Sequence, residues 1–254
     1  MRIILHGYNG RMGRAIAEKS TDIVAGVDVN LDTAAKKNAN FPVFENIGDV
    51  NIDADVVIDF TNVGAIEGLL HYCVTKKLPL VLCTTGLTPE LEAQVKAAQK
   101  HIPIFQSYNM SLGINLMARV LKQISPTLHD LGFDIEVVDV HHNKKIDAPS
   151  GTAELLAGAI TGAIEEKMML KTNRFDHFAP REKNEIGIHS LRGGTIVGRH
   201  QVMFAGENEV IELMHYAESR AIFVKGALTA AQFLMGKAPG HYDMEAVLDA
   251  LLGK

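Results

Sequence analysis

Residues 2–13 read RIILHGYNGRMG, a short apolar run followed at once by a glycine-rich loop. The run Arg2–His6 is typical of a buried strand, and a helical pattern begins directly behind the loop. Gly7, Gly10 and Gly13 allow a tight turn and let the backbone approach a pyrophosphate, which the positive end of the helix dipole attracts. The spacing is GxxGxxG, not the commoner GxGxxG, and such a loop is sometimes a simple chain reversal. Its place between a strand and a helix favours dinucleotide binding.

The same alternation continues through the first half of the chain. We expect strands at Arg2–His6, Ile23–Asp28, Asp55–Asp59, Pro79–Cys83 and Ile102–Gln106, and helices at Arg11–Lys19, Val63–Lys76 and Pro89–Lys100. Short apolar strands that alternate with helices are typical of a parallel sheet covered on both faces. The sequence therefore predicts an α/β protein with an N-terminal doubly wound, Rossmann-like parallel sheet.

The pattern changes near residue 110. The expected helices are Gly113–Gln123, Gly151–Lys167, Ser219–Leu234 and Asp243–Leu252, and the expected strands are Phe133–Val140, Glu185–Leu191, Gly198–Phe204 and Val210–His215. Clustered strands with short turns favour an antiparallel or mixed sheet. We expect residues 1–111 and 221–254 to form a dinucleotide-binding domain. Residues 112–220 should form an α+β domain on a mixed sheet, for substrate binding and oligomerisation.

Composition narrows the class of protein. The 254 residues are 47% hydrophobic and 22% charged, which suits a globular fold with a substantial core. A formal net charge of −5 argues against nucleic acid as the main partner. Apolar runs are too short to cross a membrane, and the first residues meet glycine and charge too early for a signal peptide, so we expect a cytoplasmic protein. The two cysteines form no recognisable metal pattern, and we expect no metal.

Ligands of doubly wound sheets lie outside the carboxyl ends of the strands. Asp28 ends the second strand and is placed to accept hydrogen bonds from an adenosine ribose, while two later loops reach the same edge. Thr88 and Pro89 suit the start of a helix behind one of these loops. The candidate cofactor-binding residues are Gly7, Tyr8, Asn9, Gly10, Arg11, Met12, Asp28, Cys83, Thr84, Thr85, Ser107, Tyr108, Asn109 and Met110.

Asp28 also bears on the choice between NADH and NADPH. A carboxylate accepts from the ribose 2′-hydroxyl and repels a 2′-phosphate. The next positions, Val29 and Asn30, supply no cation, whereas Arg11 and Lys36 could neutralise the phosphate. We therefore expect both cofactors to be used, with a modest preference for NADH.

Residues 139–153 read DVHHNKKIDAPSGTA and concentrate the chemically active side chains. Two histidines end a strand, two lysines follow, and a helix starts near Pro149–Thr152. Backbone N–H groups at Gly151–Ala153 suit a carboxylate, and imidazole and ammonium groups supply protons and positive charge. The stretch therefore suits a carboxylate-bearing substrate, although an HHxKK pattern alone is more often a solvated, charged loop.

This stretch resembles the signature ExHHxxKxDAPSGTA of the dihydrodipicolinate reductases. The match is continuous from His141 to Ala153, with Asp139 in place of the family's Glu. The loop Gly7–Gly13 resembles the family's GxxGRMG. Further similar elements, in the same order, are Asp59-Phe60-Thr61, Thr84-Thr85-Gly86 with Cys83 where Gly is usual, Asn109–Gly113 with Met110 for Phe, Arg192-Gly193-Gly194 and His215–Arg220.

The resemblance implies a specific reaction. The family reduces a small cyclic dicarboxylate imine with NADH or NADPH, on the diaminopimelate and lysine route. The substrate 4-hydroxy-tetrahydrodipicolinate loses water, and hydride and a proton complete the reduction to tetrahydrodipicolinate. By position, His141 would be the general acid, Lys145 its proton-donating partner and His142 a substrate contact. Gly151 and Thr152 would bind a carboxylate, and family members associate as homotetramers through their second-domain sheets.

Two other interpretations stay open at this point. One is another two-domain dehydrogenase of amino or sugar acids, against which the DAPSGT segment argues. The other is a non-catalytic NAD(H) sensor, which should have lost the His141 and Lys145 pair and should carry an effector element. His6, His189, His200 and His215 are expected to be structural, and Arg192 either contacts substrate or fixes a turn.

Overall fold

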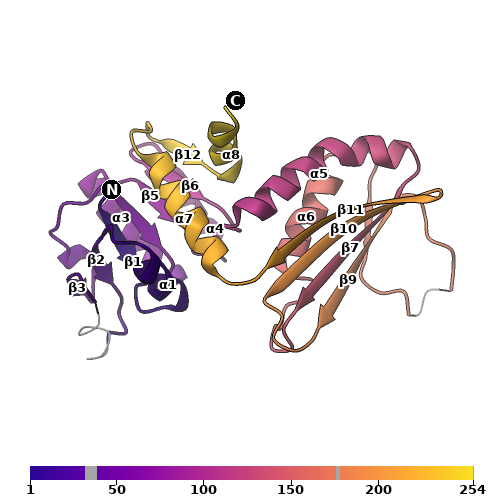
Figure 1. Cartoon of the computed structure of the whole chain (residues 1–254). Coiled ribbons are helices and arrows are strands. Elements are labelled where there is room, and N and C mark those ends of the chain that lie inside the picture. The colour runs from indigo at the N-terminus through magenta and orange to yellow at the C-terminus, as the bar shows by residue number, and fades with distance from the viewer. Residues whose placement is uncertain (32–38, 176–177, 254) are drawn as a thin grey trace. The chain divides into compact units, whose positions relative to one another are not determined.

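The computed structural model describes residues 1–31, 39–175 and 178–253. These fall into two compact units (Figure 1). The first unit comprises Met1–Leu112 and Arg220–Lys254, and the second comprises Gly113–Ser219. Within the described ranges, no helix combines the length and the apolar character needed to cross a membrane.

The first unit is built on a parallel sheet of seven strands, in the order β12-β6-β5-β4-β1-β2-β3. The strands are β1 (Ile3–His6), β2 (Ile23–Val27), β3 (Val43–Phe44), β4 (Val56–Asp59), β5 (Leu80–Leu82), β6 (Pro103–Gln106) and β12 (Gly240–Tyr242). The order runs outward in both directions from β1 and β4, which is the doubly wound arrangement predicted from the sequence. Every pairing in this sheet is parallel, so the carboxyl ends of its strands share one edge.

Helices cover both faces of this sheet. They are α1 (Arg11–Lys19), α3 (Ile66–Lys76), α4 (Pro89–Ala98), α7 (Ala221–Leu234) and α8 (Met244–Leu252), with short 3₁₀ turns η1 (Ile47–Asp49) and η2 (Val63–Ala65). One core cluster joins α1, α7 and α8 to the sheet, and a second joins α3 and α4 to it. The predicted helix start at Thr88 is confirmed, because the Thr88 hydroxyl accepts the N–H of Leu91 and Pro89 is the first helical residue.

The second unit is a mixed sheet of five strands, in the order β11-β10-β7-β9-β8. Its elements are α5 (Leu112–Asp130, whose first residue belongs to the first unit), β7 (Asp134–His141), α6 (Gly151–Thr161), β8 (Met169–Lys171), β9 (Glu185–Arg192), β10 (Gly198–Gly206) and β11 (Glu209–Ala217). Strand β7 pairs parallel with β9 and antiparallel with β10, which confirms the predicted mixed sheet.

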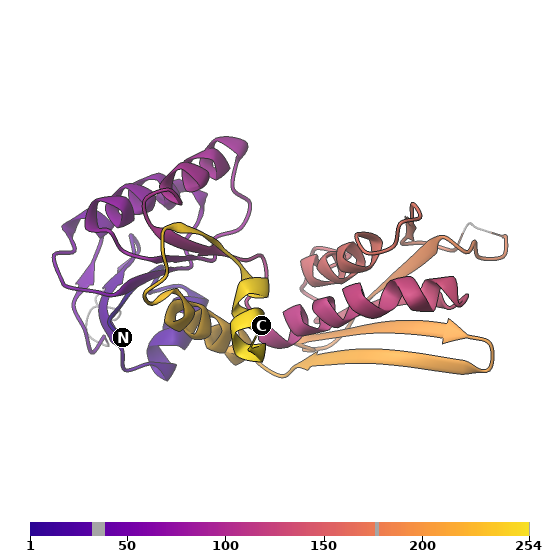
Figure 2. The ribbon, with the colours of Figure 1, turned by 90° about the horizontal axis from the view of Figure 1, so that it is seen from above.

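The two faces of this second sheet differ. Helices α5 and α6 lie on the same side of it (Figure 2), and their apolar side chains share a core cluster with the alternate residues of β7, Ile135 and Val137. The strand register places an exposed apolar set on the other side, which we call the open face: Leu191, Val210, Met214 and Tyr216. Each of these four side chains is about half exposed.

Two helices end six or seven residues away from the predicted position, and the other helix ends differ by three residues or fewer. We expected the helix at Gly113 to end near Gln123, before Pro126, but α5 continues to Asp130 with Pro126 inside it. Proline removes one backbone hydrogen bond there, and the burial of Leu121 and His129 on the same helix face compensates for it. The helix from Gly151 was expected to reach Lys167 but ends at Thr161, where Gly162 caps it.

Three short strands were not predicted. Strand β12 has the sequence GHY, without an apolar run, and depends on pairing with Pro103–Phe105 of β6. Strands β3 and β8, with two and three residues, depend likewise on their neighbours β2 and β9. Because pairing partners distant in sequence define these strands, local pattern gave no signal for them.

One glycine allows α7 to approach the sheet closely. A Cβ atom on Gly226 would lie 1.7 Å from the carbonyl oxygen of Met110, in the loop after β6. The obstructing atom belongs to the backbone, so no side-chain rotation relieves the clash. Only glycine fits at this position while α7 remains packed where it is.

We expect Gly226→Ala to lower the free energy of unfolding by about 3 kcal/mol or more, because a methyl group is forced into occupied space. Gly68→Ala is the matched control, since Gly68 lies in helix α3 with open space around it. Alanine there should stabilise the protein by up to about 1 kcal/mol. Urea unfolding of both variants tests this, and equal stability of Gly226→Ala and wild type would contradict the close packing.

Candidate active site

The glycine-rich loop between β1 and α1 has no room for side chains at two positions. A Cβ on Gly13 would lie 2.2 Å from the carbonyl oxygen of Gly7. Gly7 itself has φ +84° and would place a Cβ 2.7 Å from the carbonyl oxygen of Phe60. Helix α1 begins at Arg11 behind Gly10, which has no side chain to cap it. The loop therefore fits a cofactor pyrophosphate, because bare backbone and a helix N-terminus face the ligand position.

Asp28 holds the end of β2 against this loop. Its Oδ2 accepts the N–H of Asn9 at 3.0 Å, and its Oδ1 accepts the N–H of Asn30 at 2.9 Å. The Asn9 side chain donates to the carbonyl oxygen of Asn30 at 2.6 Å. Each carboxylate oxygen of Asp28 has a second lone pair, so the group can still accept from a ribose hydroxyl.

Arg14 is a cation near this site that sequence reasoning missed. Its Nε and Nη2 donate to Oδ1 of Asn9 at 3.1 and 2.6 Å. Arg11, the cation proposed from the sequence, lies exposed at the first residue of α1. Lys36, the other one, lies outside the described residues. Asn9 lies in the loop and Arg14 in the first turn of α1, so no helical or strand periodicity in the sequence indicates that the two side chains meet.

A buried carboxylate ties together the loops at the carboxyl ends of β1, β4 and β5. Asp59 is fully buried and accepts the hydroxyls of Thr61 at 2.7 Å and Thr84 at 2.6 Å. Nδ1 of His6 lies 2.9 Å from the same carboxylate, and this buried contact supports the loop, in line with the structural role expected of His6. The side chain of Thr84 is thus committed to holding the loop, while Thr85 is exposed beside it.

The loop after β6 holds the remaining cofactor candidates. Tyr108 is 76% exposed, whereas Met110 is 4% exposed and belongs to the core around α7. The Ser107 hydroxyl donates to the carbonyl oxygen of Asn109 at 2.9 Å, and Oδ1 of Asn109 accepts the N–H of Ser111 at 2.9 Å. Any contribution of Met110 to a ligand must come from its backbone.

In the second unit, strand register gathers polar side chains on the helix-covered face of the sheet. Asp139 of β7 lies directly opposite Ser190 of β9 and His200 of β10. His141, two residues along β7, lies opposite Arg192 of β9. Because side chains alternate along a strand, Asp139 and His141 point to the same face. All five side chains therefore belong to one cluster.

Asp139 is the centre of this cluster. The carboxylate is fully buried, and its Oδ1 lies 2.6 Å from Nδ1 of His141. Its Oδ2 accepts the backbone N–H of Ser150 at 2.8 Å, Nη2 of Arg192 at 3.1 Å and the hydroxyl of Ser190 at 3.2 Å. One buried carboxylate thereby connects β7, β9 and the start of α6.

Ser150 caps helix α6. Its hydroxyl oxygen accepts the N–H of Ala153 at 3.2 Å and lies 3.1 Å from Nε2 of His200. The expectation that the N–H groups of Gly151–Ala153 all face a ligand is therefore wrong for Ala153, whose N–H is satisfied by the cap. Gly151 and Thr152 are the first two residues of the helix.

Lys145 and Arg192 both meet Asp147 in the loop between β7 and α6. Nζ of Lys145 lies 2.8 Å from each carboxylate oxygen of Asp147, and Nη2 of Arg192 donates to the carbonyl oxygen of Asp147 at 2.6 Å. Arg192 thus holds the loop, and a contact between Arg192 and substrate stays a prediction. His142 is half-buried at the start of the same loop.

The cluster shifts several pKa values. Burial raises the pKa of Asp139, but the Ser150 N–H, Arg192 and His141 outweigh it and hold the pKa below its usual range. Burial lowers the pKa of His141, Lys145 and Arg192 lower it further, and Asp139 opposes them. Burial and the charge of His141 lower the pKa of His200 to about 4. A bound anion would raise the pKa of His141 again, because negative charge favours imidazolium.

The polar cluster also has the spacing of a metal site. One oxygen of Asp139 and ring nitrogens of His141 and His200 lie within 4.8 Å of one another, a spacing that also suits a metal ion. However, Arg192 binds the same carboxylate and the positive charge of Lys145 acts on the cluster, so its electrostatics favour an anion.

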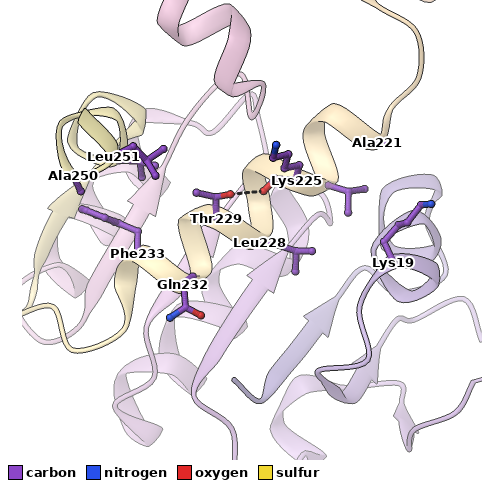
Figure 3. Close-up of a pocket in the computed structure, with 11 residues that line it drawn as sticks. Lys19, Ala221, Lys225, Leu228, Thr229, Gln232, Phe233, Ala250 and Leu251 are labelled. Atoms are coloured by element: carbon purple, nitrogen blue, oxygen red, sulfur yellow. Dashed lines mark hydrogen bonds between the residues drawn. The ribbon is translucent and has the colours of Figure 1, made fainter. Parts of the chain in front are cut away.

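A groove of about 590 Å³ lies elsewhere in the first unit (Figure 3). It is formed by α1, α7 and α8 and lined by apolar side chains such as Leu228 and Phe233, with Lys19 and Lys225 beside them. None of the cofactor candidates lines it, so it is separate from the candidate cofactor site.

The first unit has a doubly wound sheet, a glycine loop and an acidic residue after β2, and the second unit has a buried histidine and aspartate with a lysine and an arginine beside them. Together these features are typical of an NAD(P)H-dependent oxidoreductase. Sequence profiles described as "Dihydrodipicolinate reductase, N-terminus" and "Dihydrodipicolinate reductase, C-terminus" match residues 1–110 and 113–248. The chain belongs to the dihydrodipicolinate reductase family, as the sequence motifs indicated. It is therefore an NAD(P)H-dependent reductase of diaminopimelate and lysine biosynthesis, and the other dehydrogenase and sensor interpretations are not favoured.

Individual relatives agree over nearly the whole chain. The 4-hydroxy-tetrahydrodipicolinate reductase of Clostridium tetani is 48% identical over 255 residues, covering 98% of each chain. The enzyme of the same name from Caldanaerobacter subterraneus subsp. tengcongensis is 47% identical, covering 96% of this chain and 97% of that one.

Solved structures share the fold. A dipicolinate-bound dihydrodipicolinate reductase from Paenisporosarcina sp. TG-14 matches with a TM-score of 0.78 and 24% identity, over 96% of this chain and 97% of that one. A probable dehydrogenase from Thermotoga maritima matches with a TM-score of 0.61 and 14% identity, over 99% and 94%. The predicted combination of a Rossmann-like sheet and a second mixed sheet is thus confirmed.

Proposed function

We propose that this chain converts 4-hydroxy-tetrahydrodipicolinate, through dihydrodipicolinate formed by loss of water, to tetrahydrodipicolinate. The observation that carries the proposal is the buried His141, 2.6 Å from Asp139 and close to the Lys145 charge, inside the HHxxKxDAPSGTA motif. The near full-length relatives bear the name of this reductase. Residues 1–111 and 221–254 serve as the cofactor domain, and residues 112–220 serve as the substrate and association domain.

The cofactor half of the reaction depends on the first unit. NADH or NADPH supplies the hydride when bound. The loop Gly7–Met12 binds the pyrophosphate through backbone N–H groups, and Asp28 accepts from the adenosine ribose. The loops of Cys83–Thr85 and Ser107–Met110 lie at the same sheet edge and orient the nicotinamide half.

The proton comes from the second unit. Conjugate hydride addition to the imine makes an electron-rich enamine, which takes up a proton at the adjacent carbon. His141 is the general acid, and the Lys145 ammonium is its partner, which stabilises negative charge as it develops. A substrate carboxylate competes with Asp147 for Lys145, because the ion pair between them is exposed on the Asp147 side.

The substrate carboxylates bind at the start of α6. Backbone N–H groups of Gly151 and Thr152 lie at the positive end of the helix dipole, which attracts an anion. His142, at the start of the same loop, contacts the substrate ring or its second carboxylate. Two negative charges in the site raise the pKa of His141, so substrate binding itself favours the acid form.

We expect His141→Gln to reduce kcat by roughly 10²–10⁴-fold, because a positioned general acid contributes about that much. Lys145→Ala should also lose kcat while its affinity for NADH stays at the wild-type value, measured by calorimetry. The matched controls are His101→Gln and Lys144→Ala, both at exposed positions, which should keep wild-type kcat. Near wild-type turnover in His141→Gln would contradict the assignment.

We expect kcat/KM with NADH to be at least as high as with NADPH, because the carboxylate of Asp28 repels a 2′-phosphate. Asp28→Ala should narrow or reverse this preference, mainly through KM of the cofactor. Steady-state kinetics with both cofactors for wild type and variant measure it. A wild-type preference for NADPH of tenfold or more, about 1.4 kcal/mol, would mean that a cation such as Arg14 or Lys36 dominates recognition.

We expect a homotetramer in the cytoplasm, assembled through the open face of the second-unit sheet. An exposed apolar patch of Leu191, Val210, Met214 and Tyr216 favours association. Sedimentation equilibrium at micromolar concentration should give four times the chain mass, and Met214→Glu should give smaller species. A wild-type monomer at this concentration would contradict the proposal.

A further inference from the structure

We propose that Asp139 is a positioning residue for His141: it keeps a proton on Nδ1 of the ring, so that Nε2 is the atom that delivers the proton to the substrate. The proposal deepens the proposed function and rests on His141 being the general acid. It concerns the buried carboxylate that takes the place of the glutamate usual in the motif.

The distance between the two groups favours one tautomer. Oδ1 of Asp139 lies 2.6 Å from Nδ1 of His141. At that separation a lone pair on each atom would repel the other, so a proton on Nδ1 is the favoured arrangement. The Nδ1–H bond does not point straight at Oδ1, and both atoms are buried without another hydrogen-bond partner among the described residues. The ring then exchanges its second proton only at Nε2.

The surroundings of Nε2 leave it accessible. A Cβ atom at position 198 would lie 3.1 Å from Nε2 of His141, closer than side chains normally approach, and the residue there is glycine. Gly198 of β10 therefore keeps space open beside the nitrogen that must meet the substrate. Nε2 has room for a reacting partner, and Nδ1 faces the buried carboxylate.

The other carboxylate oxygen explains why Asp139 is rigid enough for this task. Three donors converge on Oδ2, from the Ser150 backbone, Arg192 and Ser190, at 2.8 to 3.2 Å. The nearest described side-chain nitrogen to Oδ1 is then Nδ1 of His141 at 2.6 Å, while Nε2 of His200 lies 3.7 Å from the same oxygen. The donors come from β9 and α6, so the orientation of the carboxylate is set by elements other than its own strand.

The charges around the ring make Asp139 decisive for its protonation. Lys145 from the loop and Arg192 from β9 disfavour imidazolium, and burial adds to their effect on the pKa of His141. His200 of β10 packs edge-to-face against the ring with centroids 5.1 Å apart, and its own pKa near 4 keeps it neutral at pH 7. Burial also lowers the pKa of His215 on β11. Among the described groups acting on His141, Asp139 is the one that raises its pKa.

The test compares Asp139→Asn, which keeps the shape and removes the charge, with Asp139→Glu, which keeps the charge. Asp139→Asn should lose about 10²-fold or more in kcat with little change in the KM for NADH. The Asn amide can donate to Nδ1 and so favours a neutral ring with its single proton on Nε2, which could give up that proton only by forming an unfavourable imidazolate. Since Asp139 raises the pKa of the acid, the alkaline limb of the kcat/KM profile should move to lower pH. Asp139→Glu should recover most of the activity and the wild-type limb.

The matched control is Asp134→Asn, the same substitution at the other end of β7, where the carboxylate pairs with Arg181. It should keep wild-type kcat and the wild-type pH profile. A direct readout is the solid-state ¹⁵N spectrum of histidine-labelled protein, with the His141 signals assigned by difference against His141→Gln. Above the His141 pKa, wild type should show a protonated Nδ1, and Asp139→Asn should show loss of that form.

The outcomes separate this proposal from the proposed function. Near wild-type activity in His141→Gln would overturn the general-acid role itself. If His141→Gln is inactive but wild type shows an unprotonated Nδ1, or Asp139→Asn keeps the wild-type kcat and alkaline limb, the positioning role is wrong. Should Asp139→Asn fail to fold, the wild-type spectrum and the Asp139→Glu profile still decide.

Discussion

The second unit depends on one buried carboxylate. Asp139 is removed from water, and such a charge is costly unless it is paired and hydrogen-bonded. The Ser150 N–H, Arg192 and Ser190 meet that requirement, and in doing so they join β7 to β9 and to the start of α6. The same arrangement places His141 against the carboxylate at the end of β7. Structural and chemical needs are therefore satisfied by a single set of contacts.

The first unit has a similar arrangement at the edge of its own sheet. Asp59, also fully buried, ties His6, Thr61 and Thr84 together at the carboxyl ends of three strands. Gly7 and Gly13 pack tightly where the loop meets α1, so that the loop presents backbone rather than side chains to a ligand at these positions. In each unit, buried polar contacts hold the loops in place, and the exposed groups beside them remain available for chemistry.

Much of the fold and of the site was predictable, because the relevant signals are local. Buried strands, the glycine loop and the HHxxK stretch each lie in a short run of sequence. The extension of α5 past Pro126 was not, since packing of Leu121 and His129 overrides the proline. Nor was the neighbourhood of Asp139, because Ser190 and His200 reach it only through strand pairing across 50 residues or more. Non-local register leaves no trace in a single sequence.

The proposed reaction takes its hydride and its proton from different sources, the cofactor and an acid of the protein. Isotope tracing tests it most directly. With NADH carrying deuterium at the transferred C4 position, in ordinary water, the account predicts one deuterium on a ring carbon of the tetrahydrodipicolinate product. With unlabelled NADH in D₂O, it predicts solvent deuterium at the adjacent carbon. Absence of cofactor-derived deuterium from the product would contradict the account.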